Sequence, residues 1–529
     1  MKKINDVPIW LVLFFNLLIA FGFYWQQKKA TVLDLSSDLA NIIPICKKID
    51  DPSLFSKDLF LADVQDVKYY TPVYVETLRF IAKIVDNNYI KALNILGSIT
   101  HFIFGILWYL VFTKIYRFSW IAFFMSILVR GIVWPPGGEL LGISELWTIM
   151  PRTLFQAILP LPFLVYVYTK KKQHILAFLV LGLISNFHPI SGIGAFIMYW
   201  SLYIGYSFLE EKRNTKEIIY KSILISFFFT IGILPFITNY FININNNLIK
   251  IDKQLFTAAF LTRIPEIFIN PLQFILQWNR KVFWFFLFSF FLFVFLDQSR
   301  KKKISKILFF TIIMLFLVSN SIYYIEGFIN QIAGMNLRMA FQFIRFQKII
   351  LIILEISLGF LLVELIERFK LKSFYQMMSL FCFIFLLLFS HISLISRLPL
   401  IGDDLGKSIL PKKFMLNIKD TNYKKSDLLT VIEYIKIHTS KDELIYGHFL
   451  IRAGADRSVY LDSKGAGMLI EGNPMKFIKW YNDYEQFNRL KSREQLDFLK
   501  QKKVKYIVSK EKYSLKMLKK TNTYKLYKL

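Results

Sequence analysis

The chain has 529 residues, of which 55% are hydrophobic and 17% aromatic, and its mean hydropathy is +0.43. One or two soluble cores cannot bury that much apolar surface, so the composition excludes an ordinary soluble protein and predicts a polytopic membrane protein. The formal net charge is +29. Many lysines and arginines stand in short clusters between apolar stretches, as in cytoplasmic loops that face anionic lipid, so we predict no nucleic-acid partner.

The first apolar stretch predicts an uncleaved membrane helix. It runs from Pro8 to Trp25, follows Lys2 and Lys3, and is not followed by a small-residue cleavage site. The two lysines favour an inside N-terminus. The polar residues 26–90 are then an external loop, in which Tyr74 to Val85 has the apolar spacing of a helix.

Ten more apolar stretches follow along the rest of residues 1–400, and basic clusters stand in some of the loops between them. We expect spans at residues 92–112, 119–134, 154–168, 175–187, 190–209, 220–241, 282–296, 307–324, 349–363 and 375–395. The clusters, such as Lys170 to Lys172 and Arg300 to Lys303, fall on alternate loops. This predicts a polytopic α-helical membrane protein of about eleven spans, with the N-terminus inside and the C-terminus outside.

Three further segments are expected outside the spans. Residues 135–152 open with two prolines and two glycines and predict an external loop. Residues 242–280 predict another loop, with an interfacial helix around Pro265 to Trp278. Residues 326–346 are expected to be external or re-entrant.

Residues 401–529 have the composition of a soluble domain and predict an extracytoplasmic α/β fold. The expected helices are Ser426 to His438, with Ser426 as N-cap, Pro474 to Phe487 and Arg493 to Gln501, and the expected strands are Glu443 to Tyr446, Ser458 to Leu461 and Lys505 to Val508. Arg457, Asp462 and Lys464 are interpreted as surface charges of a sheet edge, with recognition of a lipid headgroup or glycan as the alternative.

Carboxylates of the first two external loops are candidate catalytic groups. Asp34 and Asp38 are four residues apart, so on a helix they would share a face, and one could act as general base or ligate a metal. The alternative is a solvated acidic loop, because more aspartates follow closely. Glu139 and Glu145, in the second loop, could line the same cavity or belong to an ordinary turn.

Cationic side chains near the ends of several spans are candidate substrate-binding groups. Arg152 follows Met150 and Pro151, and Arg338 and Arg345 are two helical turns apart. Guanidinium groups there suit a phosphate, whereas the alternative is snorkelling to the headgroups. His188, beside Pro189 at membrane depth, is interpreted as a donor to substrate, a proton carrier or a satisfied structural histidine.

These motifs together resemble the uncharacterised bacterial polytopic membrane proteins of the GT-C glycosyltransferase-like class. The motifs are Asp34 to Asp38 at the exit of the first span, Asp51 to Asp58, Met150 to Arg152, His188–Pro189 and Phe343 to Arg345, with Arg457 to Lys464 resembling the small C-terminal domain of some members. The resemblance implies a polyprenyl-phosphate-linked sugar as donor and, by match, Asp38 as the acidic residue of the first loop, with Asp34 next. Here Leu35, Ser36 and Ser37 separate the two aspartates, so the identity of the base and a role for Mg²⁺ or Mn²⁺ stay open.

The expected function is therefore a membrane glycosyltransferase of the bacterial cytoplasmic membrane. It would move a sugar from a polyprenyl-phosphate donor to an acceptor glycan, lipid or protein at the outer face, with Arg345, Arg338 and Arg152 at the donor phosphate. Two alternatives remain at this point: a non-enzymatic transporter or flippase of lipid-linked saccharide, and a glycan polymerase or ligase that does not need the first-loop carboxylate.

Overall fold

The structure is a computed structural model that describes the chain except residues 1–5, 37, 132, 135–138, 141–145, 170–172, 248–250, 279–280, 297–301, 335–336 and 371–421. The expected span 375–395, the first two lysines, the cluster 170–172 and Glu145 therefore lie outside the described residues. The chain divides into two compact units. Unit 1 comprises Met1–Lys28, Leu93–Pro235 and Glu266–Leu416, and unit 2 comprises Lys29–Ala92, Phe236–Pro265 and Asn417–Leu529.

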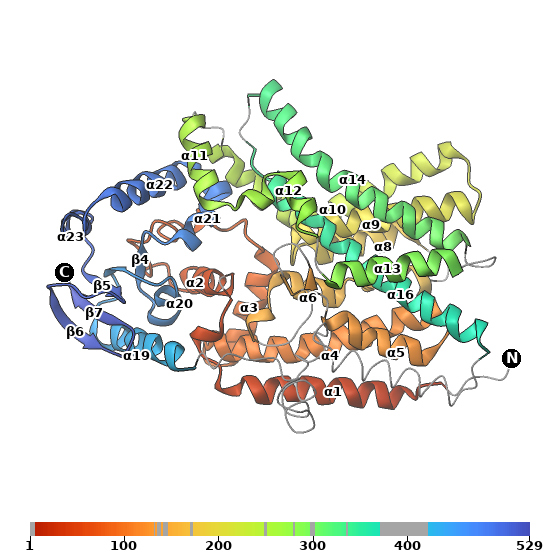
Figure 1. The fold of residues 1–529 in the computed structure, drawn as a ribbon, viewed down its shortest axis with the longest axis horizontal. Helices are drawn as coiled ribbons and strands as arrows, with labels where there is room; N and C mark the ends of the chain where they lie inside the picture. Colours follow the sequence, from red (N-terminus) through yellow and green to blue (C-terminus); the bar gives the residue numbers. More distant parts are fainter. Residues whose placement is uncertain are drawn as a thin grey trace. The chain divides into compact units, whose positions relative to one another are not determined.

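Helices make up nearly all of the described part of unit 1 (Figure 1). The helices that lie wholly or mostly in it are α1 (Ile9–Gln26), α4 (Tyr89–Tyr116), α5 (Ser119–Leu128), α6 (Pro151–Ile158), α7 (Leu161–Tyr168), α8 (His174–Ser185), α9 (Pro189–Leu209), α10 (Thr215–Asn247), α12 (Pro271–Leu276), α13 (Lys281–Leu296), α14 (Lys302–Ile332), α15 (Ala340–Phe343) and α16 (Lys348–Arg368). Four 3₁₀ turns join them, η4 (Val129–Gly131), η5 (Leu146–Thr148), η6 (Glu266–Phe268) and η7 (Ile344–Gln347), together with a hairpin of β1 (Val133–Trp134) and β2 (Glu139–Leu140).

Six of the described helical segments are long and apolar enough to cross a membrane. They are Ile9–Lys29, Tyr89–Tyr116, Pro189–Leu209, Thr215–Tyr240, Lys302–Ile332 and Ala340–Arg368, and three shorter apolar segments accompany them. Large apolar side chains on their outer faces are exposed, among them Phe227, Phe288 and Phe295. Aromatic surface of this kind needs an apolar environment, which supports the expectation of a polytopic membrane protein. The eleven spans and their orientation stay predictions.

Small residues bring the backbones of α8 and α10 into contact. A Cβ atom at Gly182 would lie 2.2 Å from the carbonyl oxygen of Phe229, and one at Gly232 would lie 2.5 Å from that of Leu179. The Asn186 side chain donates a hydrogen bond of 2.9 Å to the Gly232 carbonyl across the same crossing. Close approach at glycine combined with an interhelical hydrogen bond is typical of helix packing in membranes.

Three expected boundaries in unit 1 were wrong. The stretch 154–168 is two helices, α6 and α7, because Pro160 and Pro162 lack the N–H groups that a continuous helix needs. The stretch 119–134 is helical only to Gly131 as α5 and η4. Helix α14 continues to Ile332, eight residues beyond the expected end, since no proline interrupts it and a glycine with positive φ first occurs at Gly334, whose φ is +62°.

Unit 2 is built on a five-stranded mixed sheet in the order β4-β3-β5-β7-β6. The strands are β3 (Leu444–Tyr446), β4 (Ser458–Tyr460), β5 (Tyr506–Ser509), β6 (Lys516–Lys520) and β7 (Lys525–Lys528), and the helices of the same C-terminal segment are α19 (Asn422–His438), α20 (Leu450–Ala455), α21 (Ser463–Gly472), α22 (Pro474–Arg489) and α23 (Ser492–Gln501). Strand β3 pairs in parallel with β4 and β5, whereas β7 pairs antiparallel with β5 and β6. The three expected strands are thus confirmed as β3, β4 and β5.

Some expectations for this segment were wrong. Ser426 lies inside α19 and does not cap it, because the helix begins at Asn422. The residues around β4 include two helices that the sequence did not predict, α20 and α21. Strand β4 is an edge strand, as expected, but Arg457 is 4% exposed and donates to the carbonyls of Ala455 and Thr439, so it is not a surface charge.

The first polar loop and residues 236–265 pack against the C-terminal segment within unit 2. The loop folds into η2 (Val32–Asp34), α2 (Leu39–Asp50), η3 (Val64–Asp66) and α3 (Pro72–Ile84), and residues 253–263 form α11. Tyr69 donates to the Met468 carbonyl at 2.8 Å, Lys476 pairs with Asp66 at 2.5 Å, and the Phe256 ring packs on Phe477. Because Asp58 and Asp66 are 0% and 2% exposed, the interpretation of this stretch as a solvated acidic loop is wrong.

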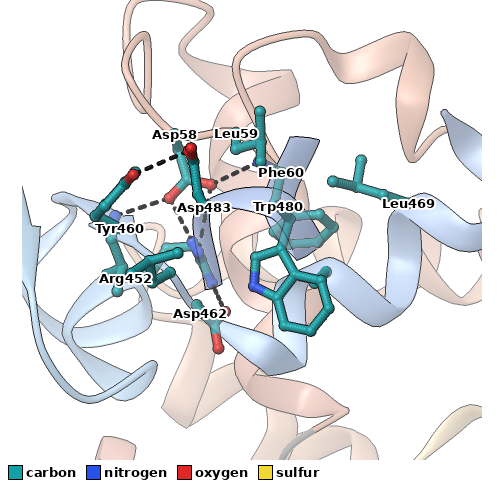
Figure 2. Close-up of a pocket in the computed structure, with 12 residues that line it drawn as sticks. Asp58, Leu59, Phe60, Arg452, Tyr460, Asp462, Leu469, Trp480 and Asp483 are labelled. Carbon is teal, nitrogen blue, oxygen red and sulfur yellow. Dashed lines mark hydrogen bonds and ion pairs between the residues drawn. The ribbon is translucent and has the colours of Figure 1, made fainter. Parts of the chain in front are cut away.

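A buried ion-pair triad ties the loop to the C-terminal segment (Figure 2). The guanidinium of Arg452, in α20, donates to Asp58 at 2.8 Å and to Asp462 at 2.7 Å. All three side chains are at most 5% exposed. Asp58 also accepts from the backbone N–H groups of Phe60, Leu61 and Val459, so with the two bonds from Arg452 its charge is balanced by five donated hydrogen bonds.

We predict that Asp58→Asn strongly destabilises unit 2. Removing one partner leaves the buried guanidinium incompletely compensated, which costs about 3–5 kcal/mol of unfolding free energy. Lys57→Ala is the matched control, because Lys57 pairs with Asp442 at 3.4 Å with both side chains largely exposed, and such pairs contribute about 0–1 kcal/mol. The measurement is protease resistance and the melting temperature of the full chain in detergent, and equal losses in the two variants would contradict the expectation.

Candidate functional site

In unit 1, three cationic side chains lie within electrostatic range of His188. They are Lys348, Arg152 and Arg345. Three of the candidates named from the sequence, Arg152, His188 and Arg345, are thus brought together, although they are separated by up to 193 residues along the chain. We call these four side chains the cationic cluster.

His188 is held by the start of α9. It is the N-cap residue of this helix, Pro189 stands at the first helical position, and the imidazole Nδ1 accepts a 3.1 Å hydrogen bond from the Ser191 backbone N–H. A neutral imidazole that accepts at Nδ1 carries its proton at Nε2. The half-buried ring can therefore offer an N–H group to a ligand.

The other members come from the starts of two further helical segments. Arg152 is the second residue of α6, and both α6 and η7 pack against α9. The Arg345 guanidinium lies 4.3 Å from the centre of the Phe268 ring, a cation–π contact that fixes its position. Lys348 opens α16 and is 4% exposed. The N-termini of α6 and α9 add positive partial charge, so the cluster suits an anion such as a phosphate.

Gln347, beside Lys348, is a buried polar side chain next to the cationic cluster. Its side chain is fully buried, and neither its amide nitrogen nor its amide oxygen has a hydrogen-bond partner among the described residues. Leaving a buried amide unsatisfied costs about 1–3 kcal/mol, so such a group normally meets water, ligand or another part of the chain.

Arg338 is not arranged as the spacing suggested. It precedes α15, so it does not share a helical face with Arg345. It lies instead within electrostatic range of Glu326, whose carboxylate accepts from the backbone N–H groups of Met339 (2.6 Å) and Ala340 (2.8 Å). These bonds hold the backbone of Met339 and Ala340 at the start of α15, which the helical pattern could not reveal.

Unlike the cationic cluster, the acidic candidates do not all belong to unit 1. Asp34 and Asp38 belong to unit 2, so their convergence with the cationic cluster of unit 1 stays a prediction. They do not share a helix, since Asp34 ends η2 and Asp38 precedes α2. Glu139 stands in β2, opposite Trp134 of β1, and its side chain is outside the described part, as is all of Glu145.

Asp34 and Asp38 differ in their hydrogen bonds to the local backbone. The Asp34 carboxylate accepts from the Thr31 backbone N–H at 2.8 Å and from the Thr31 hydroxyl, which completes a capping box around η2. Asp38 makes no capping hydrogen bond to α2, where the Ser36 hydroxyl accepts from the Leu39 N–H instead. Asp34 therefore stabilises η2, whereas Asp38 does not cap α2.

Within the described residues, no group of three or more histidine, cysteine, aspartate and glutamate side chains has the arrangement of a metal site. No known family model matches the sequence, and no curated protein matches it.

We predict that His188→Ala lowers the stability of the protein, because α9 loses the acceptor for the Ser191 N–H, at a cost of about 1 kcal/mol. His188→Asn restores a side-chain acceptor at the N-cap and is the matched control. The check is the melting temperature of each purified variant in detergent. If the alanine and asparagine variants melt at the same temperature, the capping role is wrong.

Proposed function

We propose that this chain is a membrane glycosyltransferase of the GT-C-like class. It transfers a sugar from a polyprenyl-phosphate donor to an acceptor glycan, lipid or protein at the outer face of a bacterial cytoplasmic membrane. The observation that carries the proposal is the cationic cluster, because it gathers Arg152, Arg345 and Lys348 from two distant segments around His188 in a unit made of apolar helices. Positive side chains gathered among apolar helices suit an anionic substrate.

In the proposed reaction, a carboxylate accepts a proton and positive side chains stabilise the leaving phosphate. The acceptor hydroxyl oxygen forms a bond to the anomeric carbon of the sugar while the bond from that carbon to the phosphate oxygen breaks. Asp38 takes the proton of the acceptor hydroxyl, and the electron pair leaves with the polyprenyl phosphate. Arg345 and Arg152 stabilise the charge that develops on the phosphate, and the His188 Nε2–H donates to it.

Asp38 is assigned as the base because the resemblance to GT-C enzymes matches it to the acidic residue of the first external loop. A base also has to accept a proton from solvent-accessible substrate, and Asp38 is half-exposed.

We predict that Asp38→Asn lowers transfer at least about a hundredfold, the usual contribution of a general base. Asp34→Asn is the matched control, because it changes the same charge within the same loop but touches only a cap, so transfer should stay within a few-fold of normal. The measurement is surface glycan in cells that depend on the variant, with protein amount checked by immunoblot. Unchanged glycan in the Asp38 variant at normal protein level would reject the proposal.

We predict that Arg345→Ala lowers transfer by about 10²–10³, since removing one preorganised donor to a developing oxyanion has this effect. Arg368→Ala, at the exposed end of the same helical segment, is the control and should have no effect. The same glycan assay applies. Loss of surface glycan in the Arg345 variant but not in the Asp38 variant would indicate a transporter of lipid-linked saccharide instead of a transferase.

A further inference from the structure

The edge of the sheet in unit 2 carries a hairpin rich in lysine, which the proposed transfer reaction does not use. It consists of β6, β7 and the turn between them (Figure 1). In the sequence of residues 510–528, seven residues are lysine, Glu511 is the only acidic residue, and arginine is absent. Residues 516–528 form the hairpin itself, which we call the lysine hairpin, and they include Lys516, Lys519, Lys520, Lys525 and Lys528.

The strand register places like charges directly opposite each other. Lys516 of β6 pairs with Lys528 of β7, and Lys520 pairs with Lys525. The Cβ atoms at such positions are about 5 Å apart, so like charges there weaken the strand pairing. An anion bound at the hairpin would offset this repulsion.

The ammonium groups of the lysine hairpin have no carboxylate partner among the described residues. The last lysine along the chain that forms an ion pair is Lys502, which precedes the hairpin. Lys519 lies 5.9 Å from the centre of the Tyr434 ring, and Lys525 donates to the Lys510 carbonyl at 2.7 Å. Three lysines of the hairpin are exposed to solvent, namely Lys516, Lys520 and Lys528.

Protection of the sheet edge accounts for only part of this charge. Lysine on an edge strand prevents pairing with another chain, and β6 is an edge strand. Strand β7, however, lies between β5 and β6, so Lys525 and Lys528 do not stand on an edge. A surface with this excess of one sign of charge attracts partners of the opposite sign.

The lysines lie on both faces of the hairpin. On β7, Lys525 and Lys528 are three residues apart, so their side chains point to opposite faces of the sheet. Each register partner on β6 shares the face of its lysine on β7. A flat bilayer meets one face of such a ribbon, whereas a linear polymer can pass over the edge strand and meet both.

A polymer of phosphate groups fits the hairpin better than a nucleic acid. A lysine ammonium binds phosphate as a point charge, without the planar geometry that arginine requires. Single-stranded nucleic acids are bound in addition by aromatic rings on which the bases stack. In the hairpin, Tyr527 is 1% exposed, and the Tyr524 ring carries the ammonium of Lys510 at 5.5 Å. The hairpin therefore offers charges without a stacking surface.

We propose that the lysine hairpin binds a linear anionic polymer of repeated phosphate groups, which passes over β6 and contacts lysines of both faces. The phosphates offset the repulsion within the two lysine pairs. This inference goes beyond the proposed transfer reaction and does not depend on it. It gives unit 2 a binding surface for an anionic polymer.

The test uses the full chain in nanodiscs of phosphatidylcholine and fluorescently labelled long-chain inorganic polyphosphate, with binding followed by fluorescence anisotropy. We expect saturable binding that weakens as the salt concentration rises, because exposed charges are screened. Absence of binding at low salt overturns the proposal. Tighter binding of oligothymidylate, or of vesicles that contain phosphatidylglycerol, would assign the hairpin to a nucleic acid or to a membrane and overturns it as well.

Two double variants locate the binding. Lys516→Gln with Lys520→Gln removes one charge from each lysine pair, and we expect binding of polyphosphate on the order of tenfold weaker. Lys83→Gln with Lys479→Gln is the matched control, because it removes two exposed charges of unit 2 from α3 and α22. The control should bind polyphosphate like the wild type.

The hairpin variant is expected to fold, because its substitutions relieve repulsion between like charges. Its melting temperature should not fall below that of the wild type. Should it do so, Lys525→Gln with Lys528→Gln takes its place with the same expectation for binding. Equal binding by the folded hairpin variant and the wild type, or equal weakening in the hairpin and control variants, overturns the proposal.

Discussion

The charge of Arg452 constrains the construction of unit 2 more than any other single group. A guanidinium that is 1% exposed is stable only with paired carboxylates and satisfied N–H groups, and here Asp58 and Asp462 provide both. Asp58 comes 394 residues earlier in the chain than Arg452. The first loop and the C-terminal segment consequently belong to one compact unit, and the loop that carries Asp34 and Asp38 is ordered by contacts to residues far later in the chain.

This arrangement changes the physical setting of the first-loop aspartates. In a solvated acidic loop, each carboxylate would be screened by water and interchangeable with its neighbours. In the structure the aspartates have distinct tasks: Asp58 and Asp66 are buried in ion pairs, Asp50 pairs with Arg79 at 2.7 Å, and Asp34 closes a capping box. The Ser36 hydroxyl, and not Asp38, accepts the capping bond from the Leu39 N–H at the start of α2. The carboxylates of this loop are therefore not interchangeable.

The sequence predicted the local elements well and the long-range pairs poorly. Strands β3, β4 and β5 and helices α3, α22 and α23 follow from periodicity and turn residues, which act over a few positions. Burial of Arg452 and Arg457 depends on partners that no local pattern identifies. The local pattern therefore predicts a solvated sheet edge for the charges around β4. The pairing of Arg338 with Glu326 was hidden for a related reason, since α14 runs farther than its apolar stretch and delivers Glu326 to the start of α15.

At the candidate transfer site, too, the sequence identified single residues but not their long-range arrangement. Arg152, His188 and Arg345 were selected one by one as polar groups next to apolar spans, where a charge is costly without a purpose. Their gathering around one imidazole is a property of how α6, α9 and η7 pack. The positive groups belong to unit 1 and the candidate base belongs to unit 2. In the proposed reaction Asp38 acts from the first loop, which folds against the C-terminal segment within unit 2, so the buried ion pair of Asp58 and Arg452 orders the loop that carries the base.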